Sequence, residues 1–222
     1  MDLERIGAFC KDRDILFCVD AIQSLGALVF NGEAIQADFI VADGHKWMMG
    51  PEGCALFYST PQARDRLQLY QYGWHMREGL YQFDPSHQQS SNDKWHIAQS
   101  ARRFEAGSLN MLGIHGLEAS LSLLEEVGMS VVESRILHHS QRLIAAVENH
   151  PRLSLITPTA AGRYGGIVTF GVDGVNIESL HQAVTKQGIQ CAVRAGGLRF
   201  SPHFYITTEA IDQSIESVTA LL

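Results

Sequence analysis

The feature that most constrains the fold is the stretch 15–58, in which three short apolar runs alternate with polar turns. The first run, I-L-F-C-V, ends at Asp20; the second, I-V-A, leads through D-G-H to Lys46; the third is C-A-L-F-Y. Short apolar runs bounded by turn residues predict buried strands. Because ligands bind at the carboxyl edge of open α/β sheets, the pattern predicts an acid and a lysine at a binding edge.

Lys46 has two interpretations. Most lysine side chains are solvated, which favours an ordinary surface residue. The sequence around Lys46 favours another reading, because the residue follows a predicted buried strand and precedes W-M-M. We therefore expect its amine to be partly desolvated, which favours the neutral form that reacts with aldehydes. With Asp20 holding a protonated ring nitrogen, this is the pairing that pyridoxal phosphate requires.

Two motifs extend this interpretation: D-A-I-Q-S-L-G, starting at Asp20, and A-D-F-I-V-A-D-G-H-K-W-M-M-G-P-E-G, starting at Ala37. Together they closely resemble the class V aminotransferase family, which includes cysteine desulfurases, isopenicillin N epimerase-like enzymes and kynureninase-like enzymes. The resemblance implies part of the α/β large domain of a fold type I pyridoxal phosphate enzyme, followed by a small α+β C-terminal domain.

The resemblance also implies roles for individual residues. Lys46 would form the internal aldimine and act as the catalytic base, and Asp20 would pair with the pyridinium nitrogen. Gln23 would hydrogen-bond the phenolic oxygen of the cofactor, and His45 would lie near its phosphate. Asp43 stands where many relatives have a phosphate-binding serine. Because an acid cannot take that role, Asp43 is not assigned to the phosphate.

A second block, R-R-F-E-A-G-S, ends at Ser108. In the family this block crosses a dimer interface, and its hydroxyl residue reaches the cofactor phosphate of the partner subunit. The resemblance therefore implies a homodimer in which Ser108 binds phosphate. Alternatively, Ser108 caps the helix predicted to follow it. The two interpretations are compatible, because exposed amides at a helix N-terminus also attract phosphate.

A third block, starting at Val193, reads V-R-A-G-G-L-R-F-S-P-H-F-Y-I-T. On a strand, Arg199 would point away from its apolar neighbours, and its planar guanidinium suits a carboxylate. Relatives have an arginine here, in R-x-S-x-x-x-Y-N, that binds the α-carboxylate of the substrate, although Ile206 replaces the asparagine. An exposed strand arginine without a ligand is the alternative.

The same block contains no nucleophilic cysteine. Group II cysteine desulfurases carry a cysteine on a loop between two arginines, whereas only A-G-G-L separates Arg194 from Arg199 here. Cys191 lacks a base beside it and is a poor nucleophile. A persulfide-forming desulfurase is therefore disfavoured. The other cysteines are scattered and predict buried, reduced thiols rather than disulfides or a zinc site.

Periodicity predicts the remaining elements and a domain boundary near Gly128, giving a partial cofactor-binding domain at 1–128 and a small domain at 129–222. Helices are expected over 1–11, 61–67, 110–127, 130–149, 177–187 and 208–222, and strands over 153–156, 166–170, 189–193 and 198–201. The aromatic-rich segment 68–100 is either a packed loop or the wall of a substrate cavity. Its histidines, His75, His87 and His96, lack metal-ligand spacing and predict surface or loop positions.

Composition excludes several classes of function. The net charge is −7, and no basic run is present, which disfavours nucleic acid and anionic membranes as partners. No apolar stretch approaches the roughly 20 residues that span a bilayer. The N-terminus lacks the pattern of a signal peptide. These features predict a cytoplasmic protein without a metal site.

Neither a phosphate-binding turn nor an aromatic that could stack on a cofactor ring precedes Asp20. In the resembling family both lie upstream, so the chain resembles the C-terminal half of a longer enzyme, and weak cofactor retention is expected. The predicted function is that of a pyridoxal phosphate enzyme acting on an amino acid, either transaminase-like or C–S lyase/epimerase-like. The alternative is a non-catalytic fragment or pseudoenzyme that dimerises but does not hold the cofactor.

Overall fold

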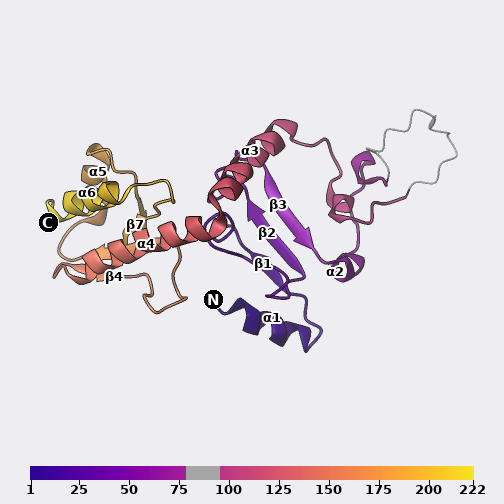
Figure 1. Cartoon of the computed structure of the whole chain (residues 1–222), viewed down its shortest axis with the longest axis horizontal. Coiled ribbons are helices and arrows are strands. Elements are labelled where there is room, and N and C mark those ends of the chain that lie inside the picture. The colour runs from indigo at the N-terminus through magenta and orange to yellow at the C-terminus, as the bar shows by residue number, and fades with distance from the viewer. Residues whose placement is uncertain (79–95) are drawn as a thin grey trace. The chain divides into compact units, whose positions relative to one another are not determined.

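A computed structural model describes residues 1–78 and 96–222 (Figure 1). They form two compact units. The N-terminal unit comprises residues 2–23 and 31–120, and the C-terminal unit comprises residues 24–30 and 121–222 together with Met1. The division falls within helix α3, Met111–Val127, shortly before the boundary predicted near Gly128. Each unit has its own sheet.

Among the described residues, the sheet of the N-terminal unit has three strands in the order β1-β2-β3. These are β1 (Cys18–Asp20), β2 (Phe39–Asp43) and β3 (Ala55–Ser59). The three strands predicted from the apolar runs are confirmed, but their predicted burial holds only for β2, because Cys18 and Asp20 of β1 and residues 55–58 of β3 are exposed. Strand β2 pairs in parallel with β1 and antiparallel with β3. The parallel pair decides the position of the site, because two parallel strands end at the same edge of a sheet.

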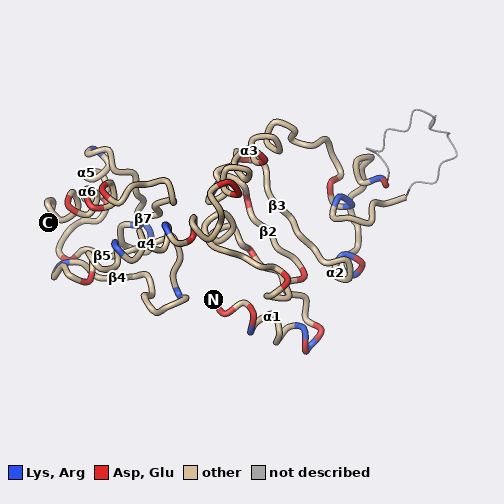
Figure 2. The backbone as a smooth tube through the Cα atoms, in the orientation of Figure 1, with Lys and Arg blue, Asp and Glu red and all other residues tan. Residues whose placement is uncertain are grey.

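The N-terminal unit also contains short helices, and side chains just before two of them cap their first turns. Asp2 caps α1 (Leu3–Lys11) by accepting the Arg5 N–H, and Thr60 caps α2 (Pro61–Asp65) by accepting the Ala63 N–H. The 3-10 helices η1 (Trp74–Met76) and η2 (Ala101–Phe104) follow. Figure 2 shows basic and acidic residues together on α1 and α2.

The C-terminal unit contains an antiparallel sheet of order β4-β5-β7-β6 and three helices. Its elements are α4 (Met129–Glu148), β4 (Leu153–Leu155), β5 (Val168–Val172), α5 (Ile177–Lys186), β6 (Ala192–Arg194), β7 (Gly197–Phe200) and α6 (Thr208–Thr219). The predicted order is confirmed. Strand β6 starts later than predicted, because the Ile189 N–H bonds to the Val184 carbonyl and still belongs to the end of α5.

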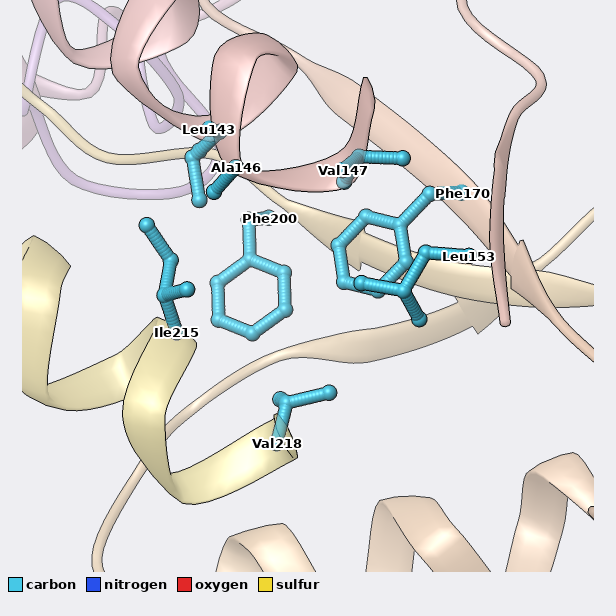
Figure 3. A pocket seen from close by; sticks show the side chains of 8 residues that line it. All are labelled: Leu143, Ala146, Val147, Leu153, Phe170, Phe200, Ile215 and Val218. Carbon is cyan, nitrogen blue, oxygen red and sulfur yellow. The ribbon is translucent and has the colours of Figure 1, made fainter. Parts of the chain in front are cut away.

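The core of the C-terminal unit forms where α4, α5 and α6 pack with the sheet. The rings of Phe170 and Phe200 stack with centroids 5.8 Å apart. Figure 3 shows both rings among the side chains that line an apolar cavity, whose volume is about 10 Å³. The cavity is lined by Leu143, Ala146, Val147, Leu153, Phe170, Phe200, Ile215 and Val218. An apolar void this small indicates nearly complete packing.

Several predictions for single residues are corrected. His75 is buried, with its ring edge-on to Trp74, instead of lying at the surface, whereas His96 is exposed. The cysteines are unpaired but not buried: Cys18 is exposed and the others are half-buried. Burial raises the pKa of Cys191, in keeping with a poor nucleophile. His87 and most of the aromatic segment lie outside the described residues.

Within the described residues, no helix is both long enough and apolar enough to cross a membrane.

The hairpin between β6 and β7 turns in two residues, since Arg194 pairs with Gly197. Both turn residues, Ala195 (φ 51°) and Gly196 (φ 77°), have left-handed backbones. Asparagine tolerates this conformation better than alanine. Ala195→Asn should therefore stabilise the C-terminal unit by about 1 kcal/mol, measured by urea unfolding followed by far-UV circular dichroism. Gly196→Ala should have the opposite sign, and a stabilising Gly196→Ala would contradict the turn.

Helices α4 and α6 are joined by Arg142, which donates to both carboxylate oxygens of Asp212. The hydrogen bonds from Arg142 lower the pKa of Asp212 below its ordinary value of 3.8. A lowered carboxyl pKa adds stability above the ordinary value, and this stability is lost as the pH falls through the folded-state pKa. The thermal midpoint of wild type should exceed that of Asp212→Asn at pH 7 and converge with it in acid. A constant difference down to pH 2 would refute the assignment, and Asp173→Asn is the exposed-acid control.

Candidate active site

The candidate site lies at the edge where β1 and β2 end. Asp20 is the last residue of β1 and pairs with Val41, and β2 ends at Asp43. The chain after β1 is tied to β2, since the Ala21 N–H donates to the Val41 carbonyl at 2.8 Å. Because the strands are parallel, the segments that follow them leave from the same edge. The structure therefore agrees with the edge predicted from the sequence.

The loop after β2 is held in one shape by backbone hydrogen bonds. The Gly44 N–H donates to the Cys54 carbonyl, and the Gly50 N–H donates to the Gly44 carbonyl, both at 2.8 Å. A Cβ atom on Gly44 would lie 2.8 Å from the Cys54 oxygen and 3.1 Å from the Leu117 side chain. Such close approach requires glycine. The loop that carries His45 and Lys46 is therefore well defined.

The expected desolvation of Lys46 is wrong for this structure. Its neighbours Trp47 and Met48 are buried, at 6% and 2% exposure, but the Lys46 side chain is exposed. The burial of these two neighbours therefore does not extend to the lysine. The Lys46 amine would therefore be desolvated only when another group, such as a bound ligand, covers it at this edge of the sheet.

Asp20 is also exposed, and its carboxylate is oriented locally. Its Oδ1 atom accepts the Ile22 N–H at 3.0 Å, an arrangement typical of aspartate at a turn. One carboxylate oxygen is thereby held by the backbone. The other, Oδ2, is the oxygen that can accept a proton-bearing ring nitrogen at this edge.

Gln23 is linked directly to the lysine loop. The Trp47 indole Nε1–H donates to Gln23 Oε1 at 3.0 Å. Because the indole nitrogen can only donate, this bond assigns the amide oxygen of Gln23 to Trp47 and leaves the NH₂ group as the donor for a ligand. From the sequence, Trp47 was expected to be only an apolar neighbour of Lys46. The missed signal is that a buried indole N–H usually requires an acceptor.

His45 is paired with Asp43, which the sequence analysis left without a role. The Nδ1 atom of His45 lies 3.1 Å from Oδ1 of Asp43. The hydrogen bond from His45 lowers the pKa of Asp43, assisted by the backbone N–H groups of Gly44 and His45 and opposed by desolvation. Asp43 is therefore ionised at neutral pH and orients the imidazole.

Ser108 is exposed in the loop between η2 and α3. Its predicted capping role is wrong, because Asn110 takes it: the Asn110 side-chain oxygen accepts the Gly113 N–H at 3.0 Å, and its NH₂ group donates to the Gly53 carbonyl. Asn110 immediately precedes α3, whereas Ser108 lies two residues further upstream, beyond the reach of the first turn.

Arg199 belongs to the C-terminal unit. Its neighbours on β7, Leu198 and Phe200, are buried in the core, while Arg199 itself is half-buried. The alternation predicted for this strand is confirmed. Its Nε atom is buried without a hydrogen-bond partner among the described residues. Buried donors are normally satisfied, so the guanidinium is a candidate binding group for an anion.

The sequence profile of the Aminotransferase class-V family matches residues 1–213. A probable cysteine desulfurase of Methanothermobacter thermautotrophicus is 25% identical, covering 99% of this chain and 57% of that protein. The apo structure of a cysteine desulfurase from Thermococcus onnurineus NA1 superposes with a TM-score of 0.86 at 24% identity, covering 99% of this chain and 56% of that one.

A further structural neighbour is a K223A mutant of C-DES with glycine covalently linked to its pyridoxal phosphate (TM-score 0.83, 21% identity, 98% of this chain and 56% of that one). The chain belongs to the class V aminotransferase family. These matches support pyridoxal phosphate as the cofactor. The chain spans a little over half the length of these relatives.

Proposed function

We propose that this chain carries the lysine-bearing part of a pyridoxal phosphate enzyme that acts on an amino acid, with Lys46 as the residue that binds the cofactor covalently. The observation that supports it most strongly is the hydrogen bond between Trp47 and Gln23. It ties the segment after β1, which carries Asp20, to the loop after β2, which carries Lys46. An acid, an amide donor and an amine are thereby placed on adjoining segments of one sheet edge.

The side chains at this edge fit the cofactor group by group. Asp20 offers a carboxylate oxygen for a ring N–H, and Gln23 offers its NH₂ group for the phenolic oxygen. His45 is oriented by Asp43 and can bind a phosphate oxygen through Nε2. The Lys46 amine is exposed and accessible to an aldehyde.

Bound pyridoxal phosphate supplies a reactive aldehyde and a ring that withdraws electrons from the substrate. The side chains of this chain would do the rest. The Asp20 carboxylate holds the proton on the ring nitrogen, and Gln23 holds the phenolic oxygen. The Nζ atom of Lys46 takes the proton from Cα of the amino acid and can return it as a general acid.

Arg199 is proposed to bind the α-carboxylate of the amino acid. Its guanidinium projects from a strand whose neighbouring side chains are locked in the core, which limits its freedom. A bidentate pair with a carboxylate uses two of its N–H donors. Ser108 is proposed to bind the cofactor phosphate of a second subunit in a homodimer.

The turn between β6 and β7 favours some reactions over others. A two-residue turn, Ala195-Gly196, separates the strands, so no loop is available there to carry a nucleophilic cysteine. Cys191, with its raised pKa, is a poor substitute. Reactions that begin with loss of the Cα proton, namely transamination, epimerisation and β-elimination, are therefore favoured over formation of an enzyme persulfide.

The test is selective labelling. The purified chain is mixed with excess pyridoxal phosphate, reduced with borohydride, digested and analysed by mass spectrometry. We expect the reduced cofactor on Lys46 in clear preference to Lys11, Lys94 and Lys186. Equal labelling of all four lysines, or none on Lys46, would refute the proposal and favour the non-catalytic alternative.

A further inference from the structure

Asp43 lies at an edge proposed to hold a phosphate, although two anions in contact repel each other. In the structure, the Asp43 carboxylate contacts His45: its Oδ1 atom is 3.1 Å from Nδ1 of the imidazole. Both atoms are buried, and their approach to each other is the polar contact that the structure gives these two atoms within the described part of the chain. Asp43 and His45 therefore form a pair directed at each other.

The protonation of this pair follows from the acid. Because the pKa of Asp43 is lowered, chiefly by the hydrogen bond from His45, its carboxylate is ionised at neutral pH and can only accept. The Nδ1 atom of His45 must then carry hydrogen. Nε2 is left as the ring nitrogen that can meet a ligand, and its direction is set by the Asp43 contact.

The backbone around the pair resists reorientation. Asp43 ends β2, and the loop that follows is closed by the bonds of Gly44 to Cys54 and of Gly50 to Gly44. The Leu117 side chain packs against both glycines. The imidazole is therefore presented from a rigid base, as a binding group requires if it is to avoid an ordering cost.

We propose that Asp43 is a positioning residue that fixes His45 so that Nε2 binds the phosphate of pyridoxal phosphate; this inference rests on the proposed function. A phosphate oxygen and a carboxylate oxygen are both acceptors, so the imidazole that bridges them carries hydrogen on both nitrogens. The acid thus serves the phosphate through the histidine without touching it.

Paired affinities test this role. The wild-type chain, Asp43→Ala, Asp43→Asn and His45→Gln are titrated with pyridoxal phosphate and with pyridoxal, which lacks the phosphate. Asp43→Ala should weaken binding of pyridoxal phosphate roughly tenfold, as expected for a hydrogen bond to a charged group, and leave pyridoxal unchanged. Asp43→Asn, which keeps an acceptor oxygen, should recover part of the loss. Glu52→Gln, at an exposed position beyond the pair, is the matched control.

The sign of the effect separates this role from simple repulsion. If Asp43 only repelled the phosphate, both Asp43→Ala and Asp43→Asn would tighten binding of pyridoxal phosphate. That result would overturn the proposal. In the background of His45→Gln, loss of Asp43 should have no further effect. The proposal would also be overturned if Asp43→Ala weakened the binding of pyridoxal and of pyridoxal phosphate equally. The same holds if the effects of Asp43→Ala and His45→Gln were additive.

A second readout does not depend on Lys46. The ¹⁵N signals of the His45 ring are followed while inorganic phosphate is added. Nε2 should respond in wild type and much less in Asp43→Ala. If Lys46 is not labelled by pyridoxal phosphate but Nε2 responds in this way, the proposed function fails and the positioning role stands. If Lys46 is labelled but the response of Nε2 is the same in wild type and Asp43→Ala, the positioning role fails and the proposed function stands.

Discussion

Replacement of Lys46 by arginine is expected to abolish covalent attachment of pyridoxal phosphate at this position and to remove cofactor-dependent proton exchange at Cα of amino acids. Arginine keeps the positive charge but stays protonated, so it can neither attack an aldehyde nor act as a base at neutral pH. Loss of a positioned general base costs about 10²–10⁴-fold in rate. The measurement is deuterium incorporation from D₂O by NMR, with the rate for cofactor alone as the background.

Lys186→Arg provides the control, because this lysine lies in the last turn of α5 and has no proposed role. It should exchange protons at the wild-type rate. If Lys46→Arg exchanged protons as fast as wild type, the base would be another group, even if borohydride traps the cofactor on Lys46 of the wild-type chain. The two readouts therefore separate binding of the cofactor from proton transfer.

The largest expected effect on stability is that of Phe200→Ala, in the core of the C-terminal unit. The ring is 6% exposed, stacks on Phe170 and lines a cavity of about 10 Å³ (Figure 3). Truncation would join the lost ring volume to this void, which surrounding side chains can only partly fill. The expected loss is about 3–5 kcal/mol in the free energy of unfolding.

Hydrogen exchange across α4 and β7 measures this loss within the C-terminal unit. All three tryptophans, Trp47, Trp74 and Trp95, belong by sequence to the N-terminal unit, so their fluorescence reports on other residues. Phe200→Leu, which leaves a smaller void, should cost less than Phe200→Ala. A loss under about 1 kcal/mol for Phe200→Ala would contradict the packing described here.

The amino-acid sequence predicted most of the elements because their signals are local. The apolar runs before Asp20 and Lys46 predicted the strands β1 and β2. The helical periodicity after Gly128 predicted the helix α4. These patterns depend on repeats of two or 3.6 residues, which a single segment contains in full. The motifs D-x-x-Q and G-H-K likewise led to the family without any knowledge of how they contact one another.

The predictions were wrong where the environment of a residue depends on the exact conformation of its neighbours in the chain. Lys46 is exposed because Trp47 and Met48 bury their own side chains, and Asn110 caps α3 in place of Ser108 because the helix begins at Met111. An error of two residues in a helix start changes the capping residue completely. Periodicity does not locate a boundary that closely.

By itself, the sequence determined the order of the strands and helices, the family, and the candidates Asp20, Gln23, His45, Lys46 and Arg199. Only the tertiary structure decided that Trp47 holds Gln23 and that Asp43 holds His45. The first contact joins residues 24 positions apart, and the second depends on how the chain turns after β2. The physical reason is that hydrogen bonds are short and directional, so the fold must place donor and acceptor before either contact exists.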